Sequence, residues 1–197
     1  MWSEMNEKMH LISLKKLQDG KYLKKYALTY LNKAGQEKIF EIVSRKELTD
    51  VSQLGSLNSG VSIAATVNGR FLLLKEFRMG VNKQIYNLCA GMFEQGETPE
   101  DCIRRELYEE TGLSLKSIKK LLKPSYAAVA ISDIKSQIAF VEAEGSISDH
   151  TSANEWIEAG LYTVEEVRQL LEKEEFSSRA QLAAYMYVLQ NGQEPCF

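Results

Sequence analysis

The residues of this chain that could do chemistry are concentrated in one glutamate-rich stretch, residues 91–113. Glu106, Glu109 and Glu110 are spaced three and four residues apart, so a helix would bring their carboxylates together on one side. Clustered carboxylate oxygens are the donors that Mg²⁺ or Mn²⁺ binds, usually with water and substrate phosphates completing the shell. Taken alone, such a trio more often marks a solvated helix surface than a metal site.

The residues around the trio help to decide between a solvated surface and a metal site. Arg105 can reach Glu109 at i+4, but one guanidinium cannot neutralise three carboxylates and also Glu97 upstream. Gly91 and Gly96 allow the loop before the helix to turn sharply and to bring backbone carbonyls close to the acidic cluster. The stretch therefore has excess negative charge and a loop that can bring carbonyl oxygens close to it, and both features favour a bound cation.

A helix must carry these glutamates, and the sequence predicts one from Pro99 to Thr111. Thr98 is a good N-cap, proline suits the first helical position, and the acidic residues of the first turn complement the helix dipole. Gly112 supplies the stop signal at the C-terminus.

The spacing across this stretch resembles the signature of the Nudix hydrolase family: Gly, five residues, Glu, seven residues, Arg-Glu, an aliphatic residue, any residue, Glu-Glu, any residue, Gly and an aliphatic residue. Every fixed position is matched, by Gly91, Glu97, Arg105, Glu106, Leu107, Glu109, Glu110, Gly112 and Leu113. Nine fixed places over 23 residues make a specific match. Outside the signature, residues 61–80 and the small N-terminal β-segment look like the ADP-ribose pyrophosphatase branch.

The resemblance implies a reaction and a cofactor. Enzymes of this family hydrolyse a nucleoside diphosphate linked to another moiety, and they use a divalent metal. For this chain it implies Mg²⁺-dependent, or Mn²⁺-dependent, cleavage of the pyrophosphate of a nucleoside diphosphate sugar such as ADP-ribose. It also implies a homodimer, because in this branch the N-terminal β-segment is often exchanged between subunits.

Carried over residue by residue, the resemblance assigns metal-binding roles. Glu106 and Glu110 would be the principal ligands, Glu109 would contribute directly or through water, and the carbonyl of Ala90 is a further candidate. Glu97 would support the metal shell, and the signature arginine would orient the glutamates.

The resemblance also assigns catalytic roles, to Arg105, Glu109, Glu110 and one late carboxylate. The general base of this branch is often a glutamate on a late loop, where this chain offers Glu144, Asp149 and Glu155. Glu155 is the preferred candidate, while a glutamate within the signature is the alternative.

Two arginines are candidates for binding the substrate phosphates. Arg78 stands where the branch has an arginine beside the substrate, and Arg45 could reach across a dimer interface. For either one, an exposed surface position is the simpler interpretation.

The chain departs from the branch in two places. The branch commonly enters the signature with Glu-Leu-Pro-Ala-Gly, whereas residues 87–91 read Asn-Leu-Cys-Ala-Gly. Members specific for ADP-ribose also tend to carry a proline about 16 residues beyond the signature, where residues 128–130 read Ala-Val-Ala. The substrate therefore stays open between ADP-ribose, another nucleotide sugar such as GDP-mannose, and a free nucleotide. A Nudix-fold sensor that binds a nucleotide without turnover is a further alternative.

The whole chain fits a globular enzyme. It has 197 residues, 44% of them hydrophobic, and a formal net charge of −3, so it has no bulk attraction to nucleic acid or anionic membranes. Its three cysteines lack metal-site spacing and cannot all pair, and no apolar run is long enough to span a membrane. These features predict a cytoplasmic protein with no nucleic-acid or membrane partner, and the resemblance implies a small-molecule nucleotide substrate.

The remaining elements predict an α/β (α+β) fold, which the resemblance specifies as a Nudix α/β/α sandwich with a central mixed sheet. Short alternating segments predict three antiparallel N-terminal strands, and Asn68-Gly69 predicts a tight hairpin turn. Residues 163–175 and 177–190 read as amphipathic helices. We expect a β-segment for dimerisation over residues 1–55 and the hydrolase domain over residues 56–197.

Overall fold

A computed structural model of the chain describes residues 9–148 and 156–192. It divides into two compact units, the residues up to Ser59 with Pro124–Ser136, and Gly60–Lys123 with the residues from Gln137 onward. The elements, in chain order, are β1 (His10–Asp19), β2 (Lys24–Leu31), β3 (Glu37–Ser44), a short 3-10 helix η1 (Val51–Gln53), β4 (Asn58–Val67), β5 (Arg70–Arg78), β6 (Lys83–Asn87), β7 (Cys89–Met92), α2 (Pro99–Thr111), β8 (Ser114–Leu121), β9 (Ser125–Tyr126), β10 (Lys135–Glu144), β11 (Ile157–Tyr162), α3 (Val164–Lys173) and α4 (Ser178–Asn191).

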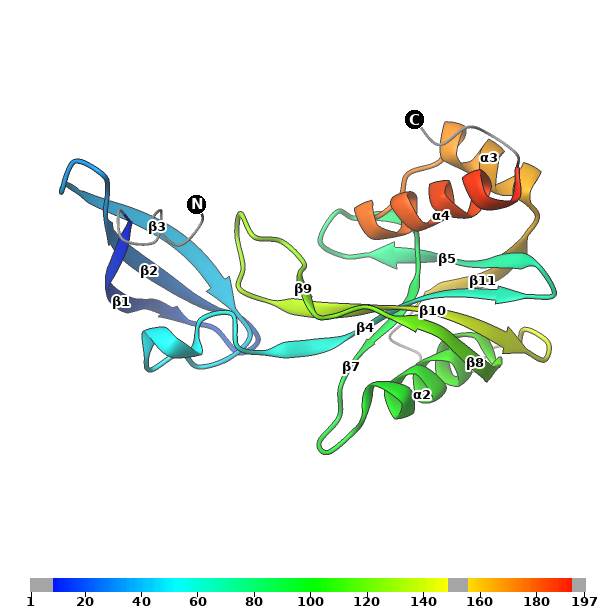
Figure 1. The fold of residues 1–197 in the computed structure, drawn as a ribbon, viewed down its shortest axis with the longest axis horizontal. Coiled ribbons are helices and arrows are strands. Elements are labelled where there is room, and N and C mark those ends of the chain that lie inside the picture. Colours follow the sequence, from blue (N-terminus) through cyan, green and yellow to red (C-terminus); the bar gives the residue numbers. More distant parts are fainter. Residues whose placement is uncertain (1–8, 149–155, 193–197) are drawn as a thin grey trace. The chain divides into compact units, whose positions relative to one another are not determined.

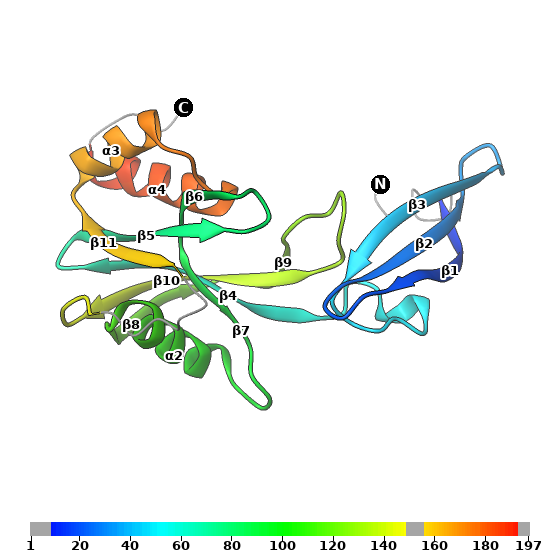
Figure 2. The ribbon, with the colours of Figure 1, turned by 180° about the vertical axis from the view of Figure 1, so that it is seen from behind.

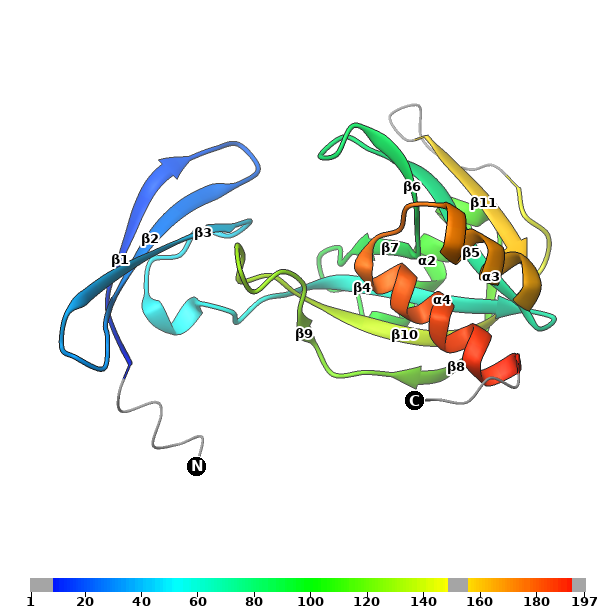
Figure 3. The same cartoon turned by 90° about the horizontal axis from the view of Figure 1, so that it is seen from above.

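The first unit is built on a three-stranded antiparallel sheet in the order β1-β2-β3 (Figure 3). Tyr26 and Leu28 of β2 lie opposite Ile42 and Phe40 of β3, so their side chains share one face. Tyr26, Leu28 and Ile42 are buried with Leu48, and the Tyr26 hydroxyl accepts a hydrogen bond from the Leu48 amide at 2.8 Å. The three predicted N-terminal strands are therefore present, with a small core on one face.

The segment Pro124–Ser136 also belongs to this unit, which the sequence does not signal. The Val43 amide donates to the Ile131 carbonyl at 2.8 Å, and Val43 forms a parallel bridge with Ser132. A small sheet has little core by itself, so a returning segment gives it surface to bury. The functional roles expected for residues 1–55 and 56–197 remain predictions.

The second unit contains the central mixed sheet, in the order β11-β5-β4-β10-β8, with β6 paired to β5 and β7 paired to β4. The predicted hairpin joins β4 and β5. Asn68 and Gly69 have φ values of 49° and 79°, the left-handed conformation that a two-residue hairpin turn of this kind requires.

Helices cover the two faces of this sheet (Figures 1 and 2). Alternate residues of β4, such as Ile63 and Ala65, pack with Ile103 and Leu107 of α2 on one face. The intervening Ala64 packs on the other face in a second cluster that includes residues of α3 and α4. The expected α/β sandwich is confirmed.

The structure also contains elements that the sequence analysis did not predict. The apolar segment at residues 84–91 forms two strands with different partners, and between them the Asn87 side chain accepts the Leu88 amide at 3.0 Å. Strand β8 follows α2 directly and has no strong alternating pattern. Within the described residues, no helix combines the length and apolar character needed to cross a membrane.

Candidate active site

The glutamate-rich stretch forms a strand, a loop and a helix, namely β7, residues 93–98 and α2. The helix has the predicted bounds, Pro99–Thr111. The Thr98 hydroxyl accepts from the Asp101 amide, and the Asp101 carboxylate accepts from the Thr98 amide, which closes both ends of a capping box. Gly112 ends the helix with a φ of 73°. These two caps fix the helix start and end on either side of the signature glutamates.

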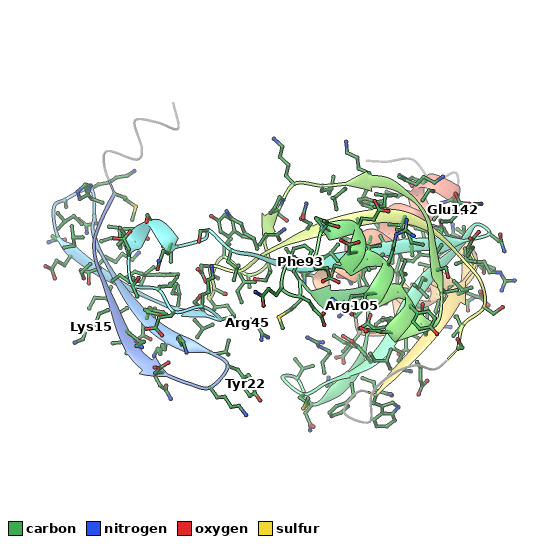
Figure 4. The ribbon with its side chains drawn as sticks, turned by 90° about the horizontal axis from the view of Figure 1, so that it is seen from below. Lys15, Tyr22, Arg45, Phe93, Arg105 and Glu142 are labelled. Carbon is green, nitrogen blue, oxygen red and sulfur yellow. The ribbon has the colours of Figure 1, made fainter. Side chains whose placement is uncertain are left out.

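Arg105 lies at the centre of the cluster and binds three of the carboxylates. Its Nε and Nη2 donate to the two oxygens of Glu97 at 2.8 and 3.0 Å, a bidentate contact. Its Nη1 donates to Glu106 at 2.6 Å and to Glu109 at 3.0 Å. Nη2 also donates to the Met92 carbonyl at 2.9 Å, which ties the helix to the loop (Figure 4 labels Arg105 and Phe93).

This network separates the acidities of the glutamates. Hydrogen bonds from Arg105 and from the Glu94 amide lower the pKa of Glu97 to about 2. Its carboxylate partners raise the pKa of Arg105 further above its ordinary value. For Glu106, burial raises the pKa and outweighs the opposing effect of Arg105. Glu97 is thus a fixed anion, whereas Glu106 carries a charge that its surroundings do not fully stabilise.

Glu110 lies outside the reach of Arg105, and it is turned toward β7. Its carboxylate accepts a hydrogen bond from the Ala90 amide at 3.0 Å. Burial raises the pKa of Glu110 to about 8, with smaller contributions from the negative charges of Glu106 and Glu76. The predicted site residues on β7 and α2 are therefore brought together, although it is the amide of Ala90 that contacts Glu110.

The site suits a divalent cation by the chemistry of its donors. Glu106 and Glu110 are oxygen donors shielded from water. Arg105 forms an ion pair with Glu106, and Glu110 forms none with the lysines and arginines that the structure describes. A β-carbon at position 91 would overlap the Glu106 carboxylate, so Gly91 provides the space that this side chain occupies. Arg105 donates to oxygens of three of the glutamates, and within the described residues no three His, Cys, Asp or Glu side chains are already grouped as metal ligands.

The structure adds a carboxylate that the sequence analysis missed. Glu76 on β5 is only 6% exposed and affects the pKa of Glu110. Its carboxylate accepts a hydrogen bond from the Asn87 side chain at 2.6 Å and forms an ion pair with Arg78 at 3.2 Å. Alternation along β5 could have revealed it, because Glu76 shares a face with the buried Leu72 and Leu74.

The other predicted residues lie elsewhere. Arg45 is exposed and belongs to the first unit, while Glu144 is the exposed last residue of β10. Glu155 lies outside the described residues, as does Asp149.

Comparison with known proteins identifies the family. A model described as the NUDIX domain matches residues 57–185. The chain belongs to the NUDIX family. It is therefore a Nudix hydrolase, and its NUDIX signature is the β7–α2 segment described above.

The individual proteins that this chain resembles share only modest sequence identity with it. An ADP-ribose pyrophosphatase of Bacillus subtilis is 27% identical over 131 residues, which span 64% of this chain and 69% of that protein. A GDP-mannose pyrophosphatase of Yersinia enterocolitica is 35% identical over 83 residues, but the match covers only 39% of this chain and 41% of that protein. The NUDIX fold is also seen in a solved structure described as an ADP compounds hydrolase, with a TM-score of 0.72, 18% identity and coverage of 94% and 96% of the two chains.

Proposed function

We propose that this Nudix hydrolase cleaves the pyrophosphate bond of a nucleoside diphosphate sugar such as ADP-ribose, with Mg²⁺ or Mn²⁺ as cofactor. The products would be a nucleoside monophosphate and a sugar phosphate. The observation that carries this proposal is the complete signature on β7 and α2, in which Arg105 holds three of the four glutamates. Similarity to the Bacillus ADP-ribose pyrophosphatase, over most of both chains, supports an ADP-ribose-like substrate.

The residues then have distinct roles. Glu106, Glu110 and Glu109 would hold the cation, with the Ala90 carbonyl as a further donor and Glu97 as support. When bound, the cation would mask the negative charge of the pyrophosphate and promote ionisation of water. The raised pKa of Glu110 favours its protonated form near neutral pH, so a cation would take the place of a proton there.

Other residues would act on the substrate and on water. Arg105 would position the glutamates through the hydrogen bonds described above, and Arg78 and Arg45 would bind phosphate oxygens. Glu109, whose side chain is 55% exposed, and Glu155 are the candidates for the base that deprotonates water.

We further propose a homodimer in the cytoplasm. The buried free thiols of Cys89 and Cys102 agree with a reducing compartment. Dimerisation is supported by the family resemblance and by the apolar residues that the three-stranded sheet exposes, which include Ile39 at 66%.

The substrate is tested by measuring phosphate release, after phosphatase treatment of the products, from a panel of nucleotide sugars and dinucleotides with Mg²⁺ or Mn²⁺. We expect a preference for ADP-ribose. A preference for GDP-mannose would instead favour the activity named for the Yersinia relative. It would also indicate that the altered residues 87–89 contribute to the choice of substrate.

The class of protein is tested by Glu110→Gln, with Glu100→Gln as the matched control on the same helix. Glu100 is exposed and pairs only at the surface with Arg104. Loss of a cation ligand should lower kcat on the order of 1,000-fold, while nucleotide binding persists and the control keeps normal turnover. Binding by the wild type without metal-stimulated hydrolysis of any panel member would favour a nucleotide sensor instead.

A further inference from the structure

The first unit contains a cavity that none of the signature residues lines. Its volume is about 250 Å³, and it lies between the three-stranded sheet and the returning segment Pro124–Ser136. The apolar part of its wall includes Leu28 and Ile42 of the sheet. Three aromatic rings, those of Tyr30, Phe40 and Tyr126, also line the cavity, and so does a single carboxylate.

That carboxylate belongs to Asp133, which is 8% exposed and lines the cavity. One of its oxygens, Oδ2, accepts the Gly55 amide at 3.2 Å. The other, Oδ1, is buried and has no hydrogen-bond partner among the described residues. A buried carboxylate oxygen without a donor is unfavourable, and a donor that reached it from the cavity would satisfy it.

The walls of the cavity favour a cation over a neutral donor. Aromatic faces attract positive charge, and the Nζ of Lys135 already lies 4.7 Å from the centroid of the Tyr126 ring. This lysine forms no ion pair with Asp133 in the part of the chain that the structure describes. Phe40 and Tyr126 are 39% and 51% exposed, so both rings remain accessible to a ligand.

The cavity is also held in shape by its backbone. Gly55 has a φ of 66°, and a β-carbon there would crowd the Tyr126 hydroxyl at 2.6 Å. The amide of the same glycine holds Asp133. The absence of a side chain at Gly55 therefore leaves room for the Tyr126 hydroxyl, while the Gly55 amide holds the carboxylate.

We propose that this cavity binds a small free organic cation that carries a primary ammonium group. The N–H donors of the ammonium satisfy Asp133 Oδ1, and its hydrocarbon part packs against Tyr30, Phe40 and Tyr126. A quaternary ammonium could pack against the same three rings, but it has no N–H group to donate to Asp133. The proposal concerns residues of the first unit alone, and it does not rest on the hydrolytic function.

The proposal is tested by titrating the full-length, ¹⁵N-labelled protein with butylammonium and benzylammonium. Butan-1-ol and benzyl alcohol serve as neutral probes of matched size. The Gly55 amide resonance is the local reporter, because this amide donates to Asp133. We expect saturable shifts with the two ammonium probes, at affinities at least about tenfold tighter than those of the alcohols. Equal affinities for ammonium and alcohol would show a merely apolar pocket and would overturn the proposal.

Asp133→Asn keeps the shape of the side chain and removes its charge, so it should weaken ammonium binding about tenfold or more. Glu37→Gln removes the same charge from an exposed position on β3 and should leave binding unchanged. If Asp133→Asn does not fold, Phe40→Leu provides a second variant, and we expect weaker ammonium binding with little change in alcohol binding. Unchanged ammonium binding in both variants would overturn the proposal. It would also be overturned if the wild type bound no ammonium and Asp133→Asn lost self-association, a result that would assign Asp133 to contact with a second copy.

Discussion

At the scale of single residues, Arg105 determines the state of the acidic cluster. Its side chain is only 22% exposed, and its guanidinium binds Glu97 in bidentate fashion while it also contacts Glu106 and Glu109. A lysine could not reproduce this geometry, because its ammonium is a point charge without a planar fork. One arginine thus reduces the repulsion among three neighbouring glutamates, and leaves Glu110 as the acid with the least compensation.

The contact between Arg105 and Glu97 should make stability depend on pH. Because the folded state lowers the pKa of Glu97 from 4.5 to about 2, the stabilisation is complete above pH 4.5 and is lost as pH falls toward 2. Glu97→Gln should therefore melt below the wild type at pH 7, and the two melting curves should converge near pH 2. The control Glu100→Gln, at an exposed pair, should show a small difference at every pH. A gap for Glu97→Gln that does not change with pH would contradict the assignment.

Asn87, where the branch commonly has glutamate, is explained by its neighbour Glu76. The Asn87 amide donates to the buried Glu76 carboxylate at 2.6 Å, and the Asn87 carbonyl oxygen accepts the Ser177 hydroxyl at 2.6 Å. An acid at position 87 would place two carboxylates in contact and would remove a donor. Asn87→Asp should therefore lower the free energy of unfolding by about 1–3 kcal/mol in urea titrations at pH 7.

The matched control for this change is Asn68→Asp, which adds the same charge in the exposed β4–β5 turn. Aspartate tolerates that conformation, so the control should stay within about 0.5 kcal/mol of the wild type. Equal effects at both positions would show that the contact with Glu76 is unimportant.

At the scale of elements, the sequence predicted best where local signals act alone. The caps Thr98 and Gly112 delimit α2, and the Asn68-Gly69 turn delimits the β4–β5 hairpin, because capping and turn geometry depend on only a few adjacent residues. The acidic cluster was predicted for the same reason, since helical spacing fixes which side chains meet. Strand β8 was missed, because its lysines obscure any alternation between apolar and polar positions.

The capping box of α2 should matter for catalysis as well as for stability. Thr98→Ala removes a cap next to Glu97, and it should lower the free energy of unfolding by about 1 kcal/mol. Thr163→Ala removes the corresponding capping box, formed with Glu166, from α3, at a similar cost in stability. Turnover in the panel assay should fall several-fold only for Thr98→Ala, because only α2 carries the signature glutamates. An equal loss of turnover in both variants would show a general effect of stability.

At the scale of the whole molecule, the least predictable features depend on contacts between distant segments. Glu76 approaches Glu110 only because β5, β4 and β7 are neighbours in one sheet. Residues 124–136 join the first unit through Val43, which lies about 90 residues earlier in the chain. No local pattern encodes such pairings, so the sequence could indicate the chemistry of the signature but not the full set of groups around it.

The same scale decides the oligomeric state. The sheet β1–β3 exposes Ile12 and Leu17 at 44% each and Ile39 at 66%, which is apolar surface that a second copy could bury. Sedimentation at micromolar concentration should therefore show a dimer, and Ile39→Glu should shift it to monomer by placing a charge in that surface. Met79→Glu is the matched control, since Met79 is 81% exposed in the second unit and should leave the dimer intact. A monomeric wild type would remove the proposed dimer, and a dimer that survives Ile39→Glu would place its interface away from Ile39.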